Sequence, residues 1–224
     1  MSVRHWPCEL RPREKLLSDG AAGLSDAELL AVIVRCGGRG SSAIALAQQL
    51  LVRFGSLREL SAAACSDFCL ETGAGRAQWA TLQAALEISR RSLKQALRQR
   101  ALMHTPALVK EFLRLWLRDQ PRECFAALFL DTQHQLIRAE TLFQGTVSQT
   151  AVYPRELARR SLELNASALV VAHNHPSGLC EPSMADRALT AALRAALQPL
   201  DINLVDHLIV ADADCFSFAE AGLI

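Results

Sequence analysis

Apolar residues recur at every third or fourth position through most of the first hundred residues, the spacing that gathers them on one side of an α-helix. A serine stands just before several of these stretches, where its side chain typically caps the first turn of a helix. Glycine, which commonly ends a helix, follows two of them. The first half is therefore predicted to be all helical, with helices between Ser25 and Gly37, over residues 42–54 before Gly55, after Ser56, and over residues 76–103.

The second half changes to short apolar runs that alternate with helical stretches, a pattern typical of a sheet flanked by helices. Thr105 followed by Pro106 marks one helix start, and Pro154 marks another. Two apolar runs separated by a short polar turn predict a β-hairpin. We expect an α+β chain with helices at 106–118, 154–165 and 184–197 and strands at 124–131, 136–143, 168–172, 202–210 and 215–218.

The composition excludes several classes of protein. Half of the 224 residues are apolar, which is ample for a core. No run of about 18 uncharged apolar residues occurs, so no transmembrane helix is expected. The first residues lack the apolar segment of a secretory signal, and the seven cysteines have no regular spacing. These features predict a cytoplasmic protein with reduced thiols and no membrane partner.

Charge is distributed unevenly between the two halves. Residues 1–101 carry 14 lysines and arginines against 9 aspartates and glutamates, whereas residues 102–224 carry 10 against 14. Together with the helix start at Thr105, this asymmetry predicts two domains, 1–101 and 102–224. The basic excess of the first domain favours an anionic partner, although an ordinary solvated helix surface explains it equally.

The turn Gly73-Ala-Gly75 precedes the longest expected helix. Glycines at a helix start expose backbone N–H groups that suit a phosphate, and this turn resembles a helix-hairpin-helix DNA-binding element. A plain inter-helix turn is the alternative. DNA is therefore a candidate partner of the first domain, through the turn and the basic residues that follow it, Arg76, Arg90, Arg91, Lys94, Arg98 and Arg100.

The segment 173–186 contains the residue types of a catalytic zinc site. His173 and His175 follow a buried apolar run, and in extended chain two residues at this spacing point to the same side. Asp186 falls in the first turn of the next helix, close enough to complete the set. Two imidazoles and a carboxylate bind zinc and leave one position for water, so we predict one Zn²⁺ per chain. A capped helix after a histidine-containing turn is the alternative.

Other polar residues near this segment have competing explanations. Ser183 opens a Ser-x-x-Asp pattern, so its hydroxyl is expected either to cap the helix or to donate to an oxyanion during catalysis. Cys180 lies in the same loop, but the ligand set is complete without it. Asp206 and His207, within an apolar strand, are either a second group near the metal or a structural hydrogen-bonding pair.

His173, His175, Ser183 and Asp186 fit the pattern of the JAB/MPN (JAMM) metallopeptidases without a gap: His-x-His, seven residues, Ser, two residues, Asp. Asn174 departs from the serine or threonine that is usual between the histidines. With the opening segment 11–17 and the helical first half, the whole chain resembles the RadC family of bacterial UPF0758-type proteins, a group once named for DNA repair. The resemblance implies an MPN-type mixed sheet flanked by helices in the second domain.

The resemblance also implies a glutamate that moves protons during hydrolysis, located at the start of the domain's first strand. Glu123, immediately before the first apolar run, occupies that place. Glu140, in the second strand of the hairpin, is the rival. A carboxylate is needed there because the attacking water must lose a proton and the departing amine must gain one.

Two hypotheses about function remain. The first is a zinc-dependent metallopeptidase or isopeptidase that uses His173, His175 and Asp186 as ligands and Glu123 as general acid and base. The second is a DNA-associated binding protein in which the metal domain is accessory. A metal-dependent nuclease is less favoured, because sites that cleave phosphodiesters tend to use more carboxylates or paired metals.

Overall fold

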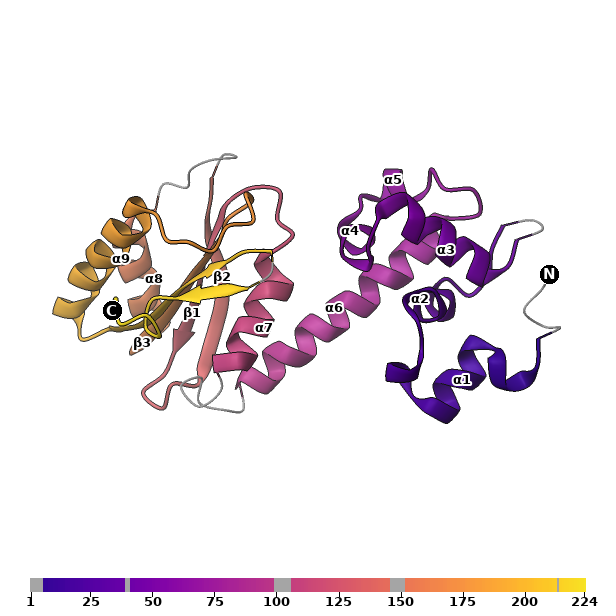
Figure 1. Ribbon diagram of the computed structural model, residues 1–224. Helices are drawn as coiled ribbons and strands as arrows, with labels where there is room; N and C mark the ends of the chain where they lie inside the picture. The colour runs from indigo at the N-terminus through magenta and orange to yellow at the C-terminus, as the bar shows by residue number, and fades with distance from the viewer. Residues whose placement is uncertain (1–5, 39–40, 99–105, 146–151, 213) are drawn as a thin grey trace. The chain divides into compact units, whose positions relative to one another are not determined.

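The computed structural model describes residues 6–38, 41–98, 106–145, 152–212 and 214–224 of the chain (Figure 1). By its contacts the chain divides into two compact units, residues Met1–Ser89 and Arg90–Ile224. The predicted domain boundary near residue 101 and the predicted cap at Thr105 lie outside the described residues. No helix in the described ranges is long and apolar enough to cross a membrane.

The first unit is helical, as predicted, and serine side chains cap the start of three of its helices. The Ser25 side chain accepts a hydrogen bond from the Glu28 N–H, and the Glu28 carboxylate accepts one from the Ser25 N–H. Ser42 and Ser56 cap the next two helices in the same position. The helices are α1 (Pro12–Asp19), α2 (Asp26–Val34), α3 (Ala43–Phe54), α4 (Leu57–Ala62), α5 (Cys65–Phe68) and α6 (Arg76–Arg98).

Some details of this unit differ from the expectation. Helix α2 ends at Val34, where Arg35 adopts a positive φ, and so stops before Gly37. Helix α5, only four residues long, is too short to show a period in the sequence. Helix α6 begins at Arg76 as predicted and is described as far as Arg98, so its expected last turn lies outside the described ranges.

The second unit is built on a five-stranded mixed sheet in the order β2-β1-β3-β4-β5. Strands β3 and β4 are parallel, and the other neighbours are antiparallel. The predicted hairpin is present as β1 and β2. The elements are α7 (Pro106–Leu117), β1 (Cys124–Leu130), β2 (Leu136–Gln144), α8 (Pro154–Glu163), β3 (Ala168–Asn174), α9 (Met184–Leu197), β4 (Asn203–Val210) and β5 (Cys215–Ser217).

Helices cover both faces of this sheet, so the predicted α+β fold is confirmed (Figure 1). Phe112 and Leu113 of α7 pack on one face, together with Leu97 from the end of α6. Leu157 of α8 and Leu193 of α9 pack on the other. Alternate residues of a strand face opposite sides of the sheet. Because helices cover both sides, β1 and β3 are buried along their whole length.

Strand β3 lies between β1 and β4, at the centre of the sheet. It continues two residues beyond the predicted end at residue 172 and includes His173 and Asn174. The expectation was wrong because the apolar run stops at Ala172, whereas the polar side chains that follow are buried with hydrogen-bond partners. His173 is thereby fixed within the sheet and not in a loop.

Candidate metal centre

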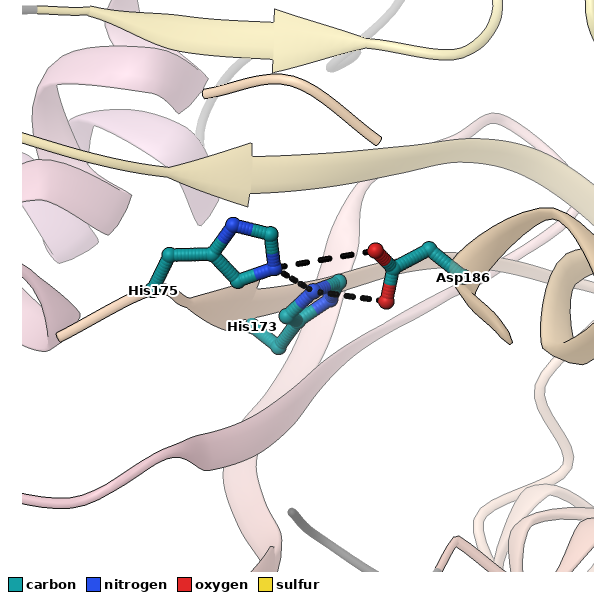
Figure 2. A group of neighbouring side chains, drawn as sticks. All are labelled: His173, His175 and Asp186. Carbon is teal, nitrogen blue, oxygen red and sulfur yellow. Dashed lines mark hydrogen bonds and ion pairs between the residues drawn. The ribbon is translucent and has the colours of Figure 1, made fainter. Parts of the chain in front are cut away.

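Three side chains, two at the end of β3 and one from the next helix, meet at one point (Figure 2). His173 is the next-to-last residue of β3, His175 follows the strand, and Asp186 comes from the first turn of α9. The N–H of His175 donates to the carbonyl of Val210, which continues the pairing with β4 past the assigned strand end. Both rings therefore point to the same side, as the alternation of extended chain predicts.

The distances between these groups suit a tetrahedral zinc ion. His173 Nε2 lies 3.0 Å from His175 Nε2 and 3.2 Å from Asp186 Oδ1, and His175 Nε2 lies 3.7 Å from Asp186 Oδ2. Ligands about 2.0–2.1 Å from a tetrahedral zinc are separated from each other by about 3.3 Å. The two distances to Asp186 are to different oxygens, and with one donor atom from each residue all three lie within 4.8 Å of one another, close enough to hold one metal ion.

The Asp186 carboxylate is ionised and oriented by its own helix. Its Oδ2 atom accepts hydrogen bonds from the N–H of Ser183, at 2.8 Å, and from the Ser183 hydroxyl, at 2.5 Å. Burial raises the pKa of Asp186, but the adjacent His173 ring and the hydrogen bonds from Ser183 outweigh it and hold that pKa well below its usual range. The predicted cap at Ser183 is thus present, and it turns Oδ1 toward His173.

His175 is held by the loop that follows it. Its Nδ1 lies 2.8 Å from the carbonyl oxygen of Leu179, which can only accept, so Nδ1 carries the hydrogen and Nε2 offers a lone pair. The side chains of His175 and Asp186 are 19% and 12% exposed, whereas that of His173 is 1% exposed. The cluster is therefore buried on the side of His173 and open to water on the side of His175.

Strand pairing brings Glu123 to the same end of the sheet. Phe125 of β1 pairs with His173 of β3 in antiparallel register, so the start of β1, which Glu123 immediately precedes, lies beside the end of β3. Phe125 and His173 also stack with ring centroids 6.5 Å apart, which shows that they share a face. Glu123 stands two residues before Phe125, and His175 stands two residues after His173, so alternation predicts this face for both.

Comparisons with known proteins agree with this arrangement. Residues 103–223 match the family described as the RadC-like JAB domain, and residues 3–80 match the UPF0758 N-terminal family. A UPF0758 protein of Chromohalobacter salexigens is 54% identical over 222 residues, which is 99% of each chain. UPF0758 proteins of Marinomonas sp. and Pseudomonas fluorescens are each 49% identical over 224 residues, the full length of both chains.

The chain belongs to the UPF0758 family. Its second unit carries the RadC-like JAB domain, and the candidate metal group of His173, His175 and Asp186 lies inside the matched range. The resemblance inferred from the His-x-His, Ser and Asp spacing is confirmed. Among the described residues, these three make up the group that can hold a metal ion.

The rival carboxylate in the RadC-like JAB domain, Glu140, is part of an ion pair between β2 and α8. Arg160 donates to it through Nε at 2.8 Å and through Nη2 at 2.5 Å. The hydrogen bond from Arg160 outweighs burial and lowers the pKa of Glu140. A carboxylate held this way is a stable anion and a poor proton carrier, so these contacts favour Glu123 as the proton-transfer residue.

Asn174, the residue that departs from the peptidase pattern, ties the start of β1 to β3. Its Oδ1 accepts from the N–H of Cys124 at 2.8 Å, and its Nδ2 donates to the carbonyls of Arg122, at 3.1 Å, and Gln120, at 3.4 Å. These groups flank Glu123 on both sides, and Asn174 is fully buried. The sequence marked Asn174 only as an exception; the structure makes it the fixing point of the backbone that carries Glu123.

We expect Asn174→Ala to destabilise the RadC-like JAB domain by about 1–3 kcal/mol, because the buried N–H of Cys124 loses its acceptor. Chemical unfolding followed by circular dichroism measures this change. Asn174→Asp is the matched comparison, since it keeps an acceptor for Cys124 but sets a carboxylate oxygen against two carbonyls. An alanine variant as stable as the parent would contradict the role given to Asn174.

The remaining candidates near the site have separate partners. The Cys180 thiol lies 3.3 Å from the carbonyl oxygen of Asp214 and is outside the metal group. Asp206 accepts from the Ser217 hydroxyl and from the N–H groups of His207 and Ala219, so it organises the turn after β5. The ring of His207, by contrast, contacts His173 directly, and burial lowers the pKa of His207 to about 3.

The glycine turn of the first unit has a packing explanation. Gly73 has a φ of +95°, and a side chain there would meet the backbone N of Gly38 at 2.5 Å. The side chain of Gln78, in the first turn of α6, donates to the carbonyl of Cys36. This hydrogen bond joins the same two segments, the one around Gly38 and the one around Gly73. The first glycine is thus required for the close approach of two backbones, whereas Arg76 at the start of α6 is exposed.

Proposed function

We propose that the RadC-like JAB domain is a zinc-dependent peptidase or isopeptidase. The observation that carries the proposal is the group of His173, His175 and Asp186, whose donor atoms all lie within 4.8 Å of one another, buried on one side and open on the other. Zinc at such a site supplies an activated water and polarises a carbonyl group. A site with three protein ligands and access to solvent is the arrangement of catalytic zinc, since structural zinc has four protein ligands.

Glu123 is the proton carrier in this proposal. Hydrolysis forms a bond between the water oxygen and the carbonyl carbon and breaks the bond between that carbon and nitrogen. One proton must leave the water and one must reach the departing amine, and a single carboxylate serves both steps in turn. The pairing of Phe125 with His173, which brings the start of β1 to the metal group, supports this role.

Ser183 has two parts in the proposal. Its hydroxyl and N–H orient the Asp186 carboxylate, and the contacts that support this part are the two hydrogen bonds to Oδ2. Its second part is to donate to the carbonyl oxygen of the substrate as negative charge develops on that atom. For this, the hydroxyl hydrogen of Ser183 must turn away from Oδ2 of Asp186. The exposure of Ser183 allows a substrate to approach it.

Removal and return of zinc test the proposal. The full chain is incubated with a mixture of synthetic peptides and lysine-linked isopeptides, and new amino termini are detected by mass spectrometry. We expect cleavage that stops after dialysis against a chelator and returns when zinc is added. Cleavage that persists in zinc-free protein would belong to another site or to a contaminant. A loaded chain that cleaves none of these peptides would contradict a general peptidase.

The association of the first unit with DNA stays a prediction. Arg76 is exposed next to Gly75, and the basic excess of residues 1–101 favours an anion. We expect the full chain to bind duplex DNA with an affinity that falls as salt rises, and Arg76→Ala to reduce the salt dependence by about one phosphate contact. Fluorescence anisotropy measures both. Arg194→Ala, an exposed change in α9, is the matched control, and equal binding by all three chains would contradict the assignment.

A further inference from the structure

A hydrogen-bonded path leads from the helix that supplies Asp186 to the back of the His173 ring. His173 Nδ1 lies 2.9 Å from Nε2 of His207, in β4. His207 Nδ1 lies 2.7 Å from the hydroxyl oxygen of Thr190, in α9. The Thr190 hydroxyl lies 2.6 Å from the carbonyl oxygen of Asp186, one helical turn earlier.

The direction of this path follows from its last atom. A carbonyl oxygen only accepts, so at 2.6 Å the single hydrogen of the Thr190 hydroxyl is committed to Asp186. The Thr190 oxygen must then accept from His207 Nδ1, which carries a hydrogen. His207 is fully buried and neutral, so its Nε2 has no hydrogen and accepts from His173 Nδ1.

This assignment determines what His173 offers to a metal ion. With the hydrogen on Nδ1, its Nε2 carries a lone pair, and Nε2 is the atom 3.0 Å from His175 Nε2 and 3.2 Å from Asp186. In the other tautomer Nε2 would carry a hydrogen directed at the ligand position. The same helix, α9, therefore supplies one ligand and orients another.

Ring packing keeps the path in place. The Phe218 ring stacks on His207 with centroids 4.9 Å apart and planes inclined by 14°. The Phe125 ring is nearly parallel to His173, at 13°. His173, Thr190 and His207 are 1%, 3% and 0% exposed, so water does not compete for these hydrogen bonds.

We propose that His207 and Thr190 are positioning residues that fix the ring tautomer of His173 and thereby raise the affinity of the site for zinc. The proposal rests on the metal site proposed above. The tautomer of His175 is set differently, by the backbone carbonyl of Leu179 alone. Loss of an outer hydrogen-bond partner of a ligating histidine typically weakens metal binding about 10–100-fold.

The test uses ring nitrogen NMR and zinc competition on the full chain. With only six histidines, selective ¹⁵N labelling gives a spectrum in which His173 and His207 are identified by substitution. In metal-free protein we expect His207 to have a protonated Nδ1 and a bare Nε2, which accepts from a protonated Nδ1 of His173. Zinc affinity is measured by competition with a chromogenic chelator, and neither readout depends on hydrolysis.

Two matched pairs of variants separate positioning from packing. Thr190→Val keeps the volume and removes the hydroxyl, whereas Thr190→Ser keeps the hydroxyl. His207→Leu removes the acceptor, whereas the Oε1 atom of His207→Gln can still accept from His173. We expect zinc affinity to fall about 10–100-fold in His207→Leu and about tenfold in Thr190→Val, and both conservative variants to remain near the parent value.

The outcomes are distinct. Should His207→Leu fail to fold, the threonine pair alone decides the matter. A hydrogen on Nε2 of His207 in the parent chain, or equal zinc affinity of Thr190→Val and Thr190→Ser, would overturn the proposal. If the tautomers are as assigned but the parent chain binds no zinc, the metal-site proposal fails by itself. If zinc binds with the expected pattern but nothing is cleaved, only the hydrolase proposal fails.

Discussion

His173→Ala and Asp186→Ala are expected to abolish zinc binding, whereas the parent chain carries about one zinc ion per molecule. Each change removes one of three ligands and leaves a site with two protein donors. The affinity should fall by more than about 100-fold, the upper end of what the loss of an outer hydrogen-bond partner costs. Metal content of purified protein, measured by plasma mass spectrometry, checks this result.

A control within the same loop makes the result specific. Glu181 is an exposed carboxylate between the histidines and Asp186 and is outside the metal group. We expect Glu181→Ala to keep its zinc. Parent protein that is free of metal after preparation without chelators would contradict the site, as would zinc that survives in both ligand variants.

Glu123→Gln is expected to keep zinc and fold but to lose hydrolysis by about 10²–10⁴-fold, the usual contribution of a general acid or base. The amide has nearly the same shape as the carboxylate but cannot take up the proton from water. Rates are measured on whichever peptide or isopeptide the zinc-loaded parent cleaves, alongside zinc content and thermal unfolding.

Glu140→Gln is the matched control for this prediction. It removes a carboxylate from the same hairpin but breaks the ion pair with Arg160, so it should alter stability more than rate. A Glu123→Gln chain that retains full activity, together with an inactive Glu140→Gln chain, would reverse the roles of the two residues.

The Glu123→Gln form also offers a way to identify the substrate of the proposed hydrolase. The inactive Glu123→Gln form, loaded with zinc, should retain a bound substrate that the parent releases after cleavage. A pull-down with this form, compared with His173→Ala, identifies proteins whose capture requires the metal site. Proteins captured equally by both forms bind elsewhere on the chain.

The local features of the site follow from the sequence because the interactions behind them span only a few residues. The cap at Ser183 joins positions three apart on one helix turn, as does the cap at Ser25. His173 and His175 face the same side because alternate residues of extended chain do so. These rules also predict most helix and strand bounds, and they fail where polar residues are buried, as at Asn174.

The tertiary structure alone decided which distant residues surround the metal group. The start of β1, just after Glu123, meets the end of β3 only because the two strands pair in one antiparallel register. His207 reaches His173 only because β4 pairs with β3 in parallel, and Asn174 joins a backbone about fifty residues earlier. Periodicity states which side of a strand is buried, but not which strand lies beside it. Pairing between strands is determined by the packing of the whole core, so the contact of His207 with His173, one of two explanations that the sequence left open, was decided only in the folded chain.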